Sequence, residues 1–175
     1  ELIFVTSLLD LSDLRGCLSR LGRVPPLLLY LHETQFDYPP GPGESQDARY
    51  GFRNLLSIVS SDRALFNSSS HLQRFFREAE AFLSRLPKPV PAEILPEARK
   101  KSGVLYPGVT ASLGGEGHGP PLVLWNHRWE HDKNPAPFFR ALYALDQPDL
   151  DWRLALLGEG YRKAPPVFEE ARERL

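Results

Sequence analysis

The densest group of chemically active side chains lies between residues 126 and 134, where the chain reads Asn-His-Arg-Trp-Glu-His-Asp-Lys-Asn. This stretch follows an apolar run and precedes a helix that is expected to begin near Pro135. Cationic side chains in a strand-to-helix loop bind phosphate groups, helped by free backbone N–H groups and the helix dipole. Arg128 and Lys133 are therefore candidate phosphate ligands, and Asn126 is a further candidate beside them. The alternative is a solvated loop without a ligand.

A second polar group follows the apolar run Leu27–Leu31. It begins with His32 and Glu33 and includes Gln35, and Asn67 stands in the same position after another apolar run. An imidazole and a carboxylate at a strand end are able to orient a sugar hydroxyl or to act as general acid and base. We expect these residues in the crevice outside the strand ends, where α/β sheets bind ligands. The alternative for the His-Glu pair is a structural role in holding the following loop.

Two further motifs carry weaker signals. Gly158 and Glu159 begin a Gly-Glu-Gly segment after an apolar run, which is a candidate phosphate loop without the full G-x-G-x-x-G spacing. The stretch from His127 to His131 fits the H-x-x-E-H pattern of inverted zinc peptidases. That chemistry needs both histidines on one helical face, whereas the expected helix begins only after this stretch. We expect no metal site, and a zinc hydrolase built on these two histidines stays an alternative.

Short apolar runs alternate with amphipathic segments along the chain, a pattern that predicts an α/β fold with parallel sheets. We expect strands at Leu2–Val5, Leu27–Leu31, Asp62–Phe66, Gly103–Tyr106, Leu122–Trp125 and Asp151–Leu157. The carboxyl ends of such strands line the ligand crevice, so the polar residues named above belong there. A helix capped near Ser12 is expected to carry Cys17 and Leu21 on its apolar face.

Composition excludes several classes of protein. The chain has 175 residues with a net charge of −1, so no overall basic field points to nucleic acid, although a local basic patch is compatible with that balance. A single cysteine excludes an internal disulfide framework and a cysteine-based zinc ribbon. No apolar run approaches the ~20 residues of a membrane span, and no signal peptide opens the chain, so we expect a soluble cytoplasmic protein. The absence of G-x-x-x-x-G-K-[ST] and G-x-S-x-G motifs argues against P-loop NTPases and α/β-hydrolases.

A glycine-rich stretch divides the sequence. Residues 108–120 contain five glycines and are typical of an interdomain linker. We expect residues 1–107 to form one Rossmann-like unit and residues 121–175 to begin a second. The chain lacks methionine, and its first residues already have the pattern of an interior strand, so we expect both units to be incomplete parts of a longer protein.

Several of these segments together resemble known glycosyltransferases. Leu122–Arg128, followed by Lys133, is similar to the first strand and loop of the donor domain in retaining GT-B enzymes, in which an Arg and a Lys five residues later bind the donor diphosphate. A fuller set resembles the tRNA-queuosine alpha-mannosyltransferase family over about residues 1–160. Its segments are Leu31–Gln35 with Tyr38-Pro39, Tyr50-Gly51-Phe52 with Asn54-Leu55, Asp62-Arg63 with Phe66–Ser68, and Trp125–Pro135. One departure is Thr34, where many relatives have Asn.

The resemblance implies a GT-B fold and a specific reaction. Mannose would pass from GDP-mannose to queuosine in tRNA, with retention of configuration and without a metal or other cofactor. Arg128 and Lys133 would bind the donor diphosphate, while His32 and Glu33 would contact the sugar or the acceptor from the other domain. The first unit would then be the acceptor-side domain, and the second would begin the nucleotide-sugar donor domain.

A tRNA acceptor needs a local basic surface, for which Arg49, Arg53 and Arg63 are candidates. Glycines near Gly108 would let two domains close and exclude water from the reaction. Two other functions remain open at this point. One is a noncatalytic Rossmann-like module that binds a phosphorylated ligand, and the other is the zinc hydrolase described above.

Overall fold

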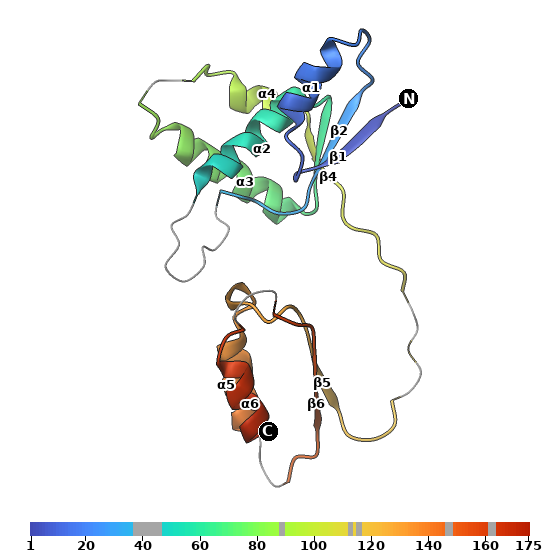
Figure 1. The fold of residues 1–175 in the computed structure, drawn as a ribbon, viewed down its shortest axis with the longest axis vertical. Coiled ribbons are helices and arrows are strands. Elements are labelled where there is room, and N and C mark those ends of the chain that lie inside the picture. Colours follow the sequence, from blue (N-terminus) through green and yellow to red (C-terminus); the bar gives the residue numbers. More distant parts are fainter. Residues whose placement is uncertain (37–46, 88–89, 112–113, 115–116, 146–148, 161–163) are drawn as a thin grey trace. The chain divides into compact units, whose positions relative to one another are not determined.

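The computed structural model describes residues 1–175 apart from 37–46, 88–89, 112–113, 115–116, 146–148 and 161–163. The described residues form two compact units, Glu1–Thr110 and Ala111–Leu175 (Figure 1). Each unit has its own sheet and its own hydrophobic core. Every helix in the described part of the chain is too short or too polar to cross a membrane.

The sheet of the first unit has four parallel strands in sequence order. Its strands are β1 (Ile3–Thr6), β2 (Leu27–Leu31), β3 (Arg63–Phe66) and β4 (Ser102–Val104). The register pairs Val5 with Leu29 and Leu29 with Ala64, which aligns the carboxyl ends of the strands. Strand β2 is a continuous apolar run because it lies inside the sheet, and Leu27, Leu29 and Leu31 are fully buried.

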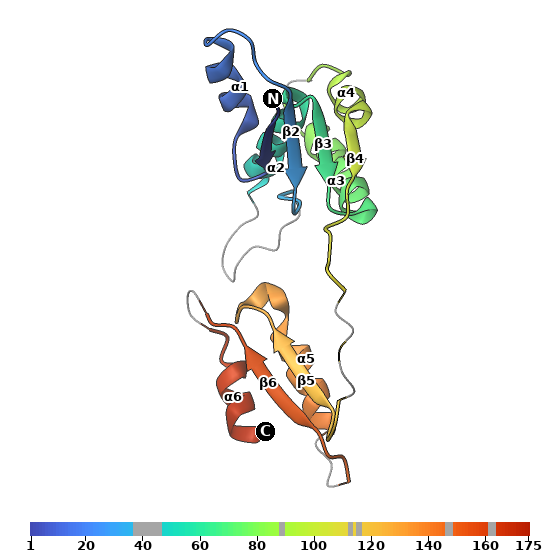
Figure 2. The same ribbon diagram turned by 90° about the vertical axis from the view of Figure 1, so that its right-hand side faces the viewer.

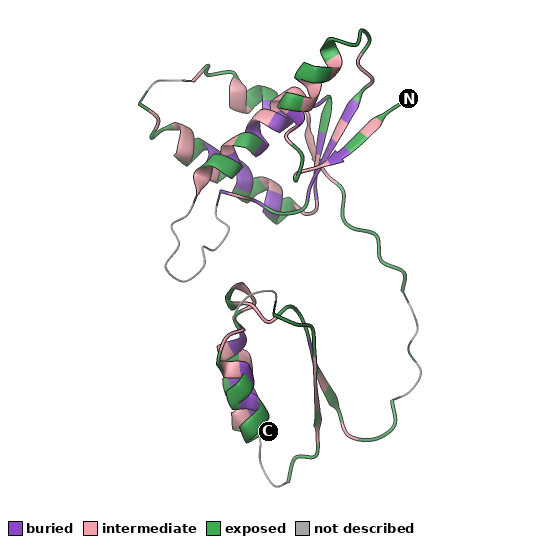
Figure 3. Cartoon of the chain, in the orientation of Figure 1, coloured by how far each residue is buried: buried purple, intermediate pink, exposed green. Residues whose placement is uncertain are grey.

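Four helices cover one face of this sheet. They are α1 (Leu11–Ser19), α2 (Ala48–Ser60), α3 (Ser69–Leu83) and α4 (Ile94–Lys100). Each connection advances by one strand in the same direction, so right-handed crossovers place every helix on the same side (Figures 1 and 2). Buried residues lie mainly where the strands and the helices of this unit face each other (Figure 3). Phe66, Phe75 and Phe76 are fully buried members of this core. On the opposite face of the sheet, Phe4 is 56% exposed.

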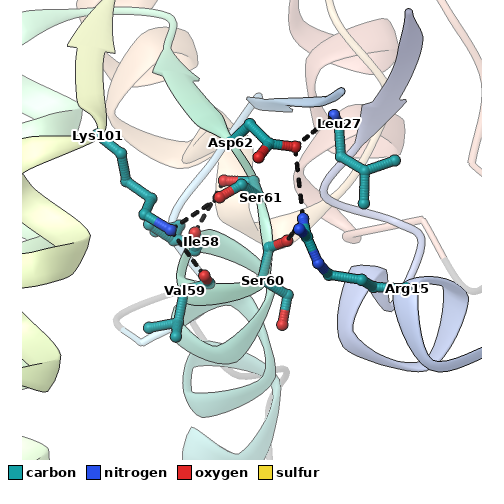
Figure 4. Close-up of polar contacts among 8 residues, drawn as sticks. All are labelled: Arg15, Leu27, Ile58, Val59, Ser60, Ser61, Asp62 and Lys101. Carbon is teal, nitrogen blue, oxygen red and sulfur yellow. Dashed lines mark hydrogen bonds and ion pairs between the residues drawn. The ribbon is translucent and has the colours of Figure 1, made fainter. Parts of the chain in front are cut away.

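Two cations cap the C-terminus of α2 near the amino ends of the strands (Figure 4). Arg15 of α1 donates a hydrogen bond to the Ser60 carbonyl at 2.7 Å. The Lys101 ammonium donates to the carbonyls of Val59 and Ser61, both at 2.8 Å. The last carbonyls of a helix have no partner within the helix, so these cations satisfy them. The contacts fix α2 against α1 and against the segment that leads into β4.

Asp62 joins this end of α2 to strand β2. Its carboxylate accepts a hydrogen bond from the Leu27 backbone N–H at 2.8 Å and lies 3.4 Å from the Arg15 guanidinium (Figure 4). The Leu27 N–H is the main reason that the pKa of Asp62 is lowered below its ordinary value, and Arg15 lowers it further. The charged form of Asp62 therefore stabilises the folded first unit.

The second unit has a two-stranded parallel sheet with its helices on one face (Figure 1). Its elements are β5 (Leu122–Asn126), the 3-10 helix η1 (His131–Lys133), α5 (Pro135–Leu145), β6 (Arg153–Leu157) and α6 (Val167–Arg174). The buried Trp125 ring of β5 lies 6.2 Å from the Phe139 ring and 5.6 Å from the Phe168 ring, between centroids. Trp129 stacks on Phe168 with centroids 4.7 Å apart and planes 9° apart. This aromatic core anchors the loop that follows β5.

Both units confirm the predicted α/β fold with parallel sheets. The predicted core position of Cys17 is wrong, because Cys17 is exposed. Each helical residue advances by about 100°, so Cys17 lies off the stripe that Leu11 and Leu18 present to the core. Leu21, expected on the same face, follows the end of the helix and is 82% exposed.

Two segments named in the sequence analysis fall outside the described residues, wholly or in part. One is Tyr38-Pro39, and the other is the glycine-rich linker at 108–120. The assignment of residues 1–107 to the acceptor side and of 121–175 to the donor side concerns roles that a fold alone does not assign, so it stays a prediction.

Candidate functional site

A pocket of about 370 Å³ opens in the first unit at the carboxyl ends of β1 and β2. Its lining residues come from the segment after β1, the segment after β2, and α2. They are Ser7, Leu8, Leu9, Asp10, Glu33, Gln35, Tyr50, Arg53, Asn54 and Ser57. Parallel sheets bind ligands at this place, and the volume lies within the usual range of small-molecule pockets, about 300–1,000 Å³.

Two residues predicted for the site, Glu33 and Gln35, line this pocket. Gln35 Nε2 donates a hydrogen bond to Glu33 Oε1 at 2.9 Å. Thr34, between them, is buried, and its hydroxyl accepts from the Phe36 N–H at 3.4 Å. The Phe36 ring packs against Phe75 with centroids 5.3 Å apart. The side chain at position 34 therefore supports the turn that presents Glu33 and Gln35 to the pocket.

Gly51 allows this turn to lie close to α2. A Cβ at position 51 would collide with the Phe36 ring, so a larger residue there requires that ring to move. Within the Tyr50-Gly51-Phe52 segment, Gly51 therefore serves the packing of the turn on the helix, while Tyr50 lines the pocket.

An ion pair forms one wall of the pocket. Arg53 Nε of α2 donates to Asp10 Oδ2 at 2.8 Å. Asp10 also caps α1, because Oδ1 accepts from the backbone N–H groups of Ser12 and Asp13 at 3.1 and 3.3 Å. The Ser12 hydroxyl is the main reason that the pKa of Asp10 is lowered, and Arg53 lowers it further. The guanidinium of Arg53, a predicted tRNA contact, is thus paired with a carboxylate.

Asn54 is a lining residue that the sequence did not single out as a site residue. It is 5% exposed, and its Nδ2 has no hydrogen-bond partner among the residues that the structure describes. The other buried residues of α2 are Gly51, Leu55 and Ile58, which carry no polar side-chain atoms, and Ser57, whose hydroxyl accepts the Leu11 N–H. Buried polar groups are normally hydrogen-bonded. An amide on the buried side of an amphipathic helix is the signal that could have identified Asn54.

His32 is outside this pocket, since the described lining residues do not include it. Its ring packs edge-on against Tyr30 with centroids 4.9 Å apart. Asn67 Nδ2 donates to the His32 carbonyl, and Asn67 Oδ1 lies 2.9 Å from Nδ1 of the buried His71. Successive residues of an extended segment point to opposite sides. The structure therefore places Glu33 in the pocket and His32 away from it, while Asn67 connects β2, β3 and α3.

The predicted phosphate ligands of the second unit lie in the loop between β5 and α5. Arg128 Nη2 is 3.2 Å from Glu130 Oε2, and Lys133 Nζ is 2.7 Å from Asp132 Oδ2. The Arg128 side chain is 49% exposed and that of Lys133 is 30% exposed. Asn126 is exposed at the end of β5. Both cations thus belong to one loop, and each contacts a carboxylate of that loop.

The segment after β6 holds this loop in place through the backbone. The Trp129 N–H donates to the Glu159 carbonyl at 3.1 Å, and the Trp125 indole donates to the His127 carbonyl at 3.0 Å. Gly158 has a φ of +100°, and a Cβ there would collide with the His127 carbonyl. The structure therefore brings the predicted Gly-Glu-Gly segment against the loop that contains Arg128 and Lys133, here called the cationic loop. Glycine at 158 permits the close approach.

The zinc alternative requires His127 and His131 on one helix. His127 instead lies in the loop after β5, and His131 begins the short η1 helix, so the two histidines do not share a helical face. Within the described residues, no group of three or more His, Cys, Asp or Glu side chains could hold a metal ion.

The three arginines predicted for a tRNA surface do not gather in one place. Arg49 and Arg53 lie in the first half of α2, near the carboxyl ends of the strands, whereas Arg63 begins β3. Helix α2 has 13 residues and is about 20 Å long, and it separates the two positions. Arg63 therefore lies at the opposite end of the first unit from Arg49 and Arg53. Arg49 Nη2 also pairs with Asp47 Oδ2 at 2.7 Å.

The two Rossmann-like parallel units have polar side chains at their strand ends, an arrangement typical of α/β proteins that bind ligands there. Residues 1–109 match the family model described as tRNA-queuosine alpha-mannosyltransferase N-terminal. The chain is 31% identical over 192 residues to a curated tRNA-queuosine alpha-mannosyltransferase of Drosophila melanogaster. The match covers 100% of this chain and 50% of that relative.

The chain belongs to the tRNA-queuosine alpha-mannosyltransferase family, which confirms the resemblance noted in the sequence. It spans half the length of the curated relative that it matches. No solved structure matches the chain.

Proposed function

We propose that this chain forms part of a cytoplasmic, retaining GT-B glycosyltransferase that transfers mannose from GDP-mannose to queuosine in tRNA. Membership of the family, the name of the Drosophila relative and the two parallel α/β units support the proposal. In this proposal the first unit belongs to the acceptor side and the second unit begins the donor side.

The observation that carries the proposal is the anchored loop that holds Arg128 and Lys133. When the bond between the sugar and the diphosphate breaks, negative charge grows on the leaving oxygen. Cations that are already in place stabilise this charge without further reorganisation. Trp129 lies between the two cations in sequence, and its bond to the Glu159 carbonyl together with its stacking on Phe168 keeps the loop in position. Arg128 and Lys133 are thus proposed to supply the charge stabilisation, with no metal ion in the reaction.

Glu33 and Asp10 are the acidic residues that line the pocket of the first unit, and Asp10 pairs with Arg53. The Glu33 carboxylate is held by Gln35 at 2.9 Å, so it is positioned to accept a hydrogen bond from a ligand hydroxyl. A carboxylate in this position acts as a general base when it takes the hydroxyl proton. His32 is outside the pocket. In this proposal His32 contacts the parts of the ligand that extend beyond the pocket.

Replacement of Arg128 tests the proposal. In the complete enzyme, Arg128→Ala is expected to lower kcat for mannose transfer by about 10²–10³-fold, because it removes a preorganised partner of the developing charge. The free energy of unfolding should change by about 0.5 kcal/mol or less. Arg140→Ala, at an exposed position of α5, is the matched control. Turnover of Arg128→Ala equal to that of the control would remove Arg128 from the mechanism. Absence of transfer by the complete wild-type enzyme would instead favour the noncatalytic binding module.

A further inference from the structure

We propose that the pocket at the carboxyl ends of β1 and β2 binds an uncharged or cationic hydroxylated ring, with Asn54 Nδ2 as its buried hydrogen-bond donor. This inference rests on the proposed function and deepens it, because the queuosine acceptor and the mannose of the donor both carry a hydroxylated ring. The chemistry of the pocket fits either ring, and the experiment below distinguishes them.

Asn54 is the first support for this assignment. The residue is 95% buried, since only 5% of it is exposed, and it lines the pocket. Its Nδ2 donates to no atom of the described part of the chain. A buried amide donor without an acceptor destabilises the folded protein. A ligand oxygen that reaches Nδ2 from the pocket would supply the missing acceptor, so Asn54 is the proposed buried donor of this site.

The charge of the pocket is the second support. Its charged lining residues are Asp10, Glu33 and Arg53. Asp10 and Arg53 pair at 2.8 Å, so the carboxylate of Glu33 leaves the pocket with an excess of negative charge. A phosphate or diphosphate would be repelled there, whereas hydroxyl and ammonium groups find an acceptor. The pocket is therefore suited to the part of a substrate that carries no phosphate.

The remaining polar lining residues match a ring with several hydroxyls. Ser57 Oγ accepts a hydrogen bond from the Leu11 N–H at 3.1 Å, so the hydroxyl proton of Ser57 remains available to a ligand oxygen. Glu33 supplies acceptor oxygens at the other side of the pocket, and Leu8 and Leu9 offer apolar contact. A volume of about 370 Å³ accommodates a single ring with its substituents.

The test compares Asn54→Leu and Asn54→Ala with wild type in the complete enzyme. Gln73→Leu, at an exposed position of α3, is the matched control because it also replaces an amide with an apolar side chain. Dissociation constants are measured for tRNA that carries queuosine, for the same tRNA with guanosine in its place, and for GDP-mannose. Thermal unfolding of each variant is measured in parallel.

We expect both Asn54 variants to bind one of the two ring-bearing ligands about five- to tenfold more weakly, the usual effect of one lost hydrogen bond. The melting temperature of Asn54→Leu should equal or exceed that of wild type, because an unsatisfied buried polar group has been removed. A purely structural asparagine would show the opposite change in stability. Gln73→Leu should leave all dissociation constants unchanged.

The pattern of the loss identifies the ring. Weaker binding of queuosine tRNA but not of guanosine tRNA assigns the pocket to the acceptor, and weaker binding of GDP-mannose alone assigns it to the donor sugar. Unchanged dissociation constants for all three ligands would overturn the assignment, as would a lower melting temperature in both Asn54 variants. Wild-type enzyme that binds these ligands but transfers no mannose would contradict the proposed function and not the pocket.

Discussion

The two candidate sites differ in how their charged residues are brought together. In the first unit, Asp10 and Arg53 are 43 residues apart in sequence and meet across α1 and α2. In the second unit, Arg128 and its partner Glu130 belong to one short loop. The fold assembles the first site from separate segments, whereas one strand and one helix position the second as a continuous piece. A site of the second kind is visible in a sequence, and a site of the first kind needs the structure.

The two sites also differ in charge. The pocket of the first unit holds Glu33 in excess over the Asp10–Arg53 ion pair, whereas in the loop of the second unit Arg128 and Lys133 each pair with a carboxylate. In the proposed reaction a hydroxylated ring suits the first environment, and the anionic diphosphate takes the place of Glu130 and Asp132 at the two cations of the second.

We expect an added methyl group to destabilise the protein more at the loop of the second unit than beside the pocket of the first unit. Gly158→Ala sets a Cβ against the His127 carbonyl at a φ of +100°, so the backbone must move. We expect a loss of about 1–3 kcal/mol in the free energy of unfolding, together with reduced transfer. Gly51→Ala meets the Phe36 ring, a side chain that is able to shift, and should lose less, about 1 kcal/mol.

Urea denaturation measures both losses. Gly117→Ala is the control, because nothing lies within 4 Å of a Cβ built at that position. A loss of unfolding free energy for Gly51→Ala equal to or greater than that for Gly158→Ala would contradict the prediction that the loop of the second unit is the more sensitive of the two.

Asp62 is expected to stabilise the first unit by a smaller amount and to have no role in its pocket. Asp62→Asn removes the charge that accepts the Leu27 N–H and should lower the free energy of unfolding by about 1 kcal/mol near neutral pH. The pKa of Asp62 is lowered in the folded state, so this contribution is present above the unfolded pKa of about 3.9. It is lost as the pH falls through the lower folded pKa.

Urea denaturation of wild type and Asp62→Asn from neutral to acidic pH tests this prediction. The difference between them should narrow as the pH falls below about 3.9, while mannose transfer at neutral pH stays unchanged. Asp151→Asn, at an exposed position of the second unit, is the control. A difference that does not vary with pH would show that the Asp62 charge is not the source of the stability.

The elements that local sequence determines could be predicted closely. Strand β2 has the predicted bounds Leu27–Leu31, and α5 begins at Pro135 as predicted. A continuous apolar run and a proline at the first helical position act within a few residues. Strand β4 was predicted at Gly103–Tyr106 but lies at Ser102–Val104. It pairs with β3 alone, so the register of that pairing, rather than its own residues, sets its ends.

The same distinction applies to the candidate sites. Glu33 and Arg128 could be placed at strand ends because each lies two residues after the end of a strand with an apolar sequence, although their roles stay predictions. Asn54 could not be assigned to a pocket, because the surroundings of a helical residue depend on which segments pack against that helix. The pairing of Asp10 with Arg53 depends on the packing of α1 beside α2, which no local pattern shows.

Mannose transfer by the complete enzyme in excess EDTA most directly tests whether Arg128 and Lys133 stabilise the leaving group without a metal ion. Mg²⁺ usually binds one or two carboxylates and the substrate phosphates, and the carboxylates of Glu130 and Asp132 in the cationic loop contact Arg128 and Lys133. We predict transfer from GDP-mannose to queuosine in tRNA that persists in EDTA and weakens with rising salt, because fixed cations provide the charge. Absence of transfer, or transfer lost in EDTA and restored by Mg²⁺, would contradict the account.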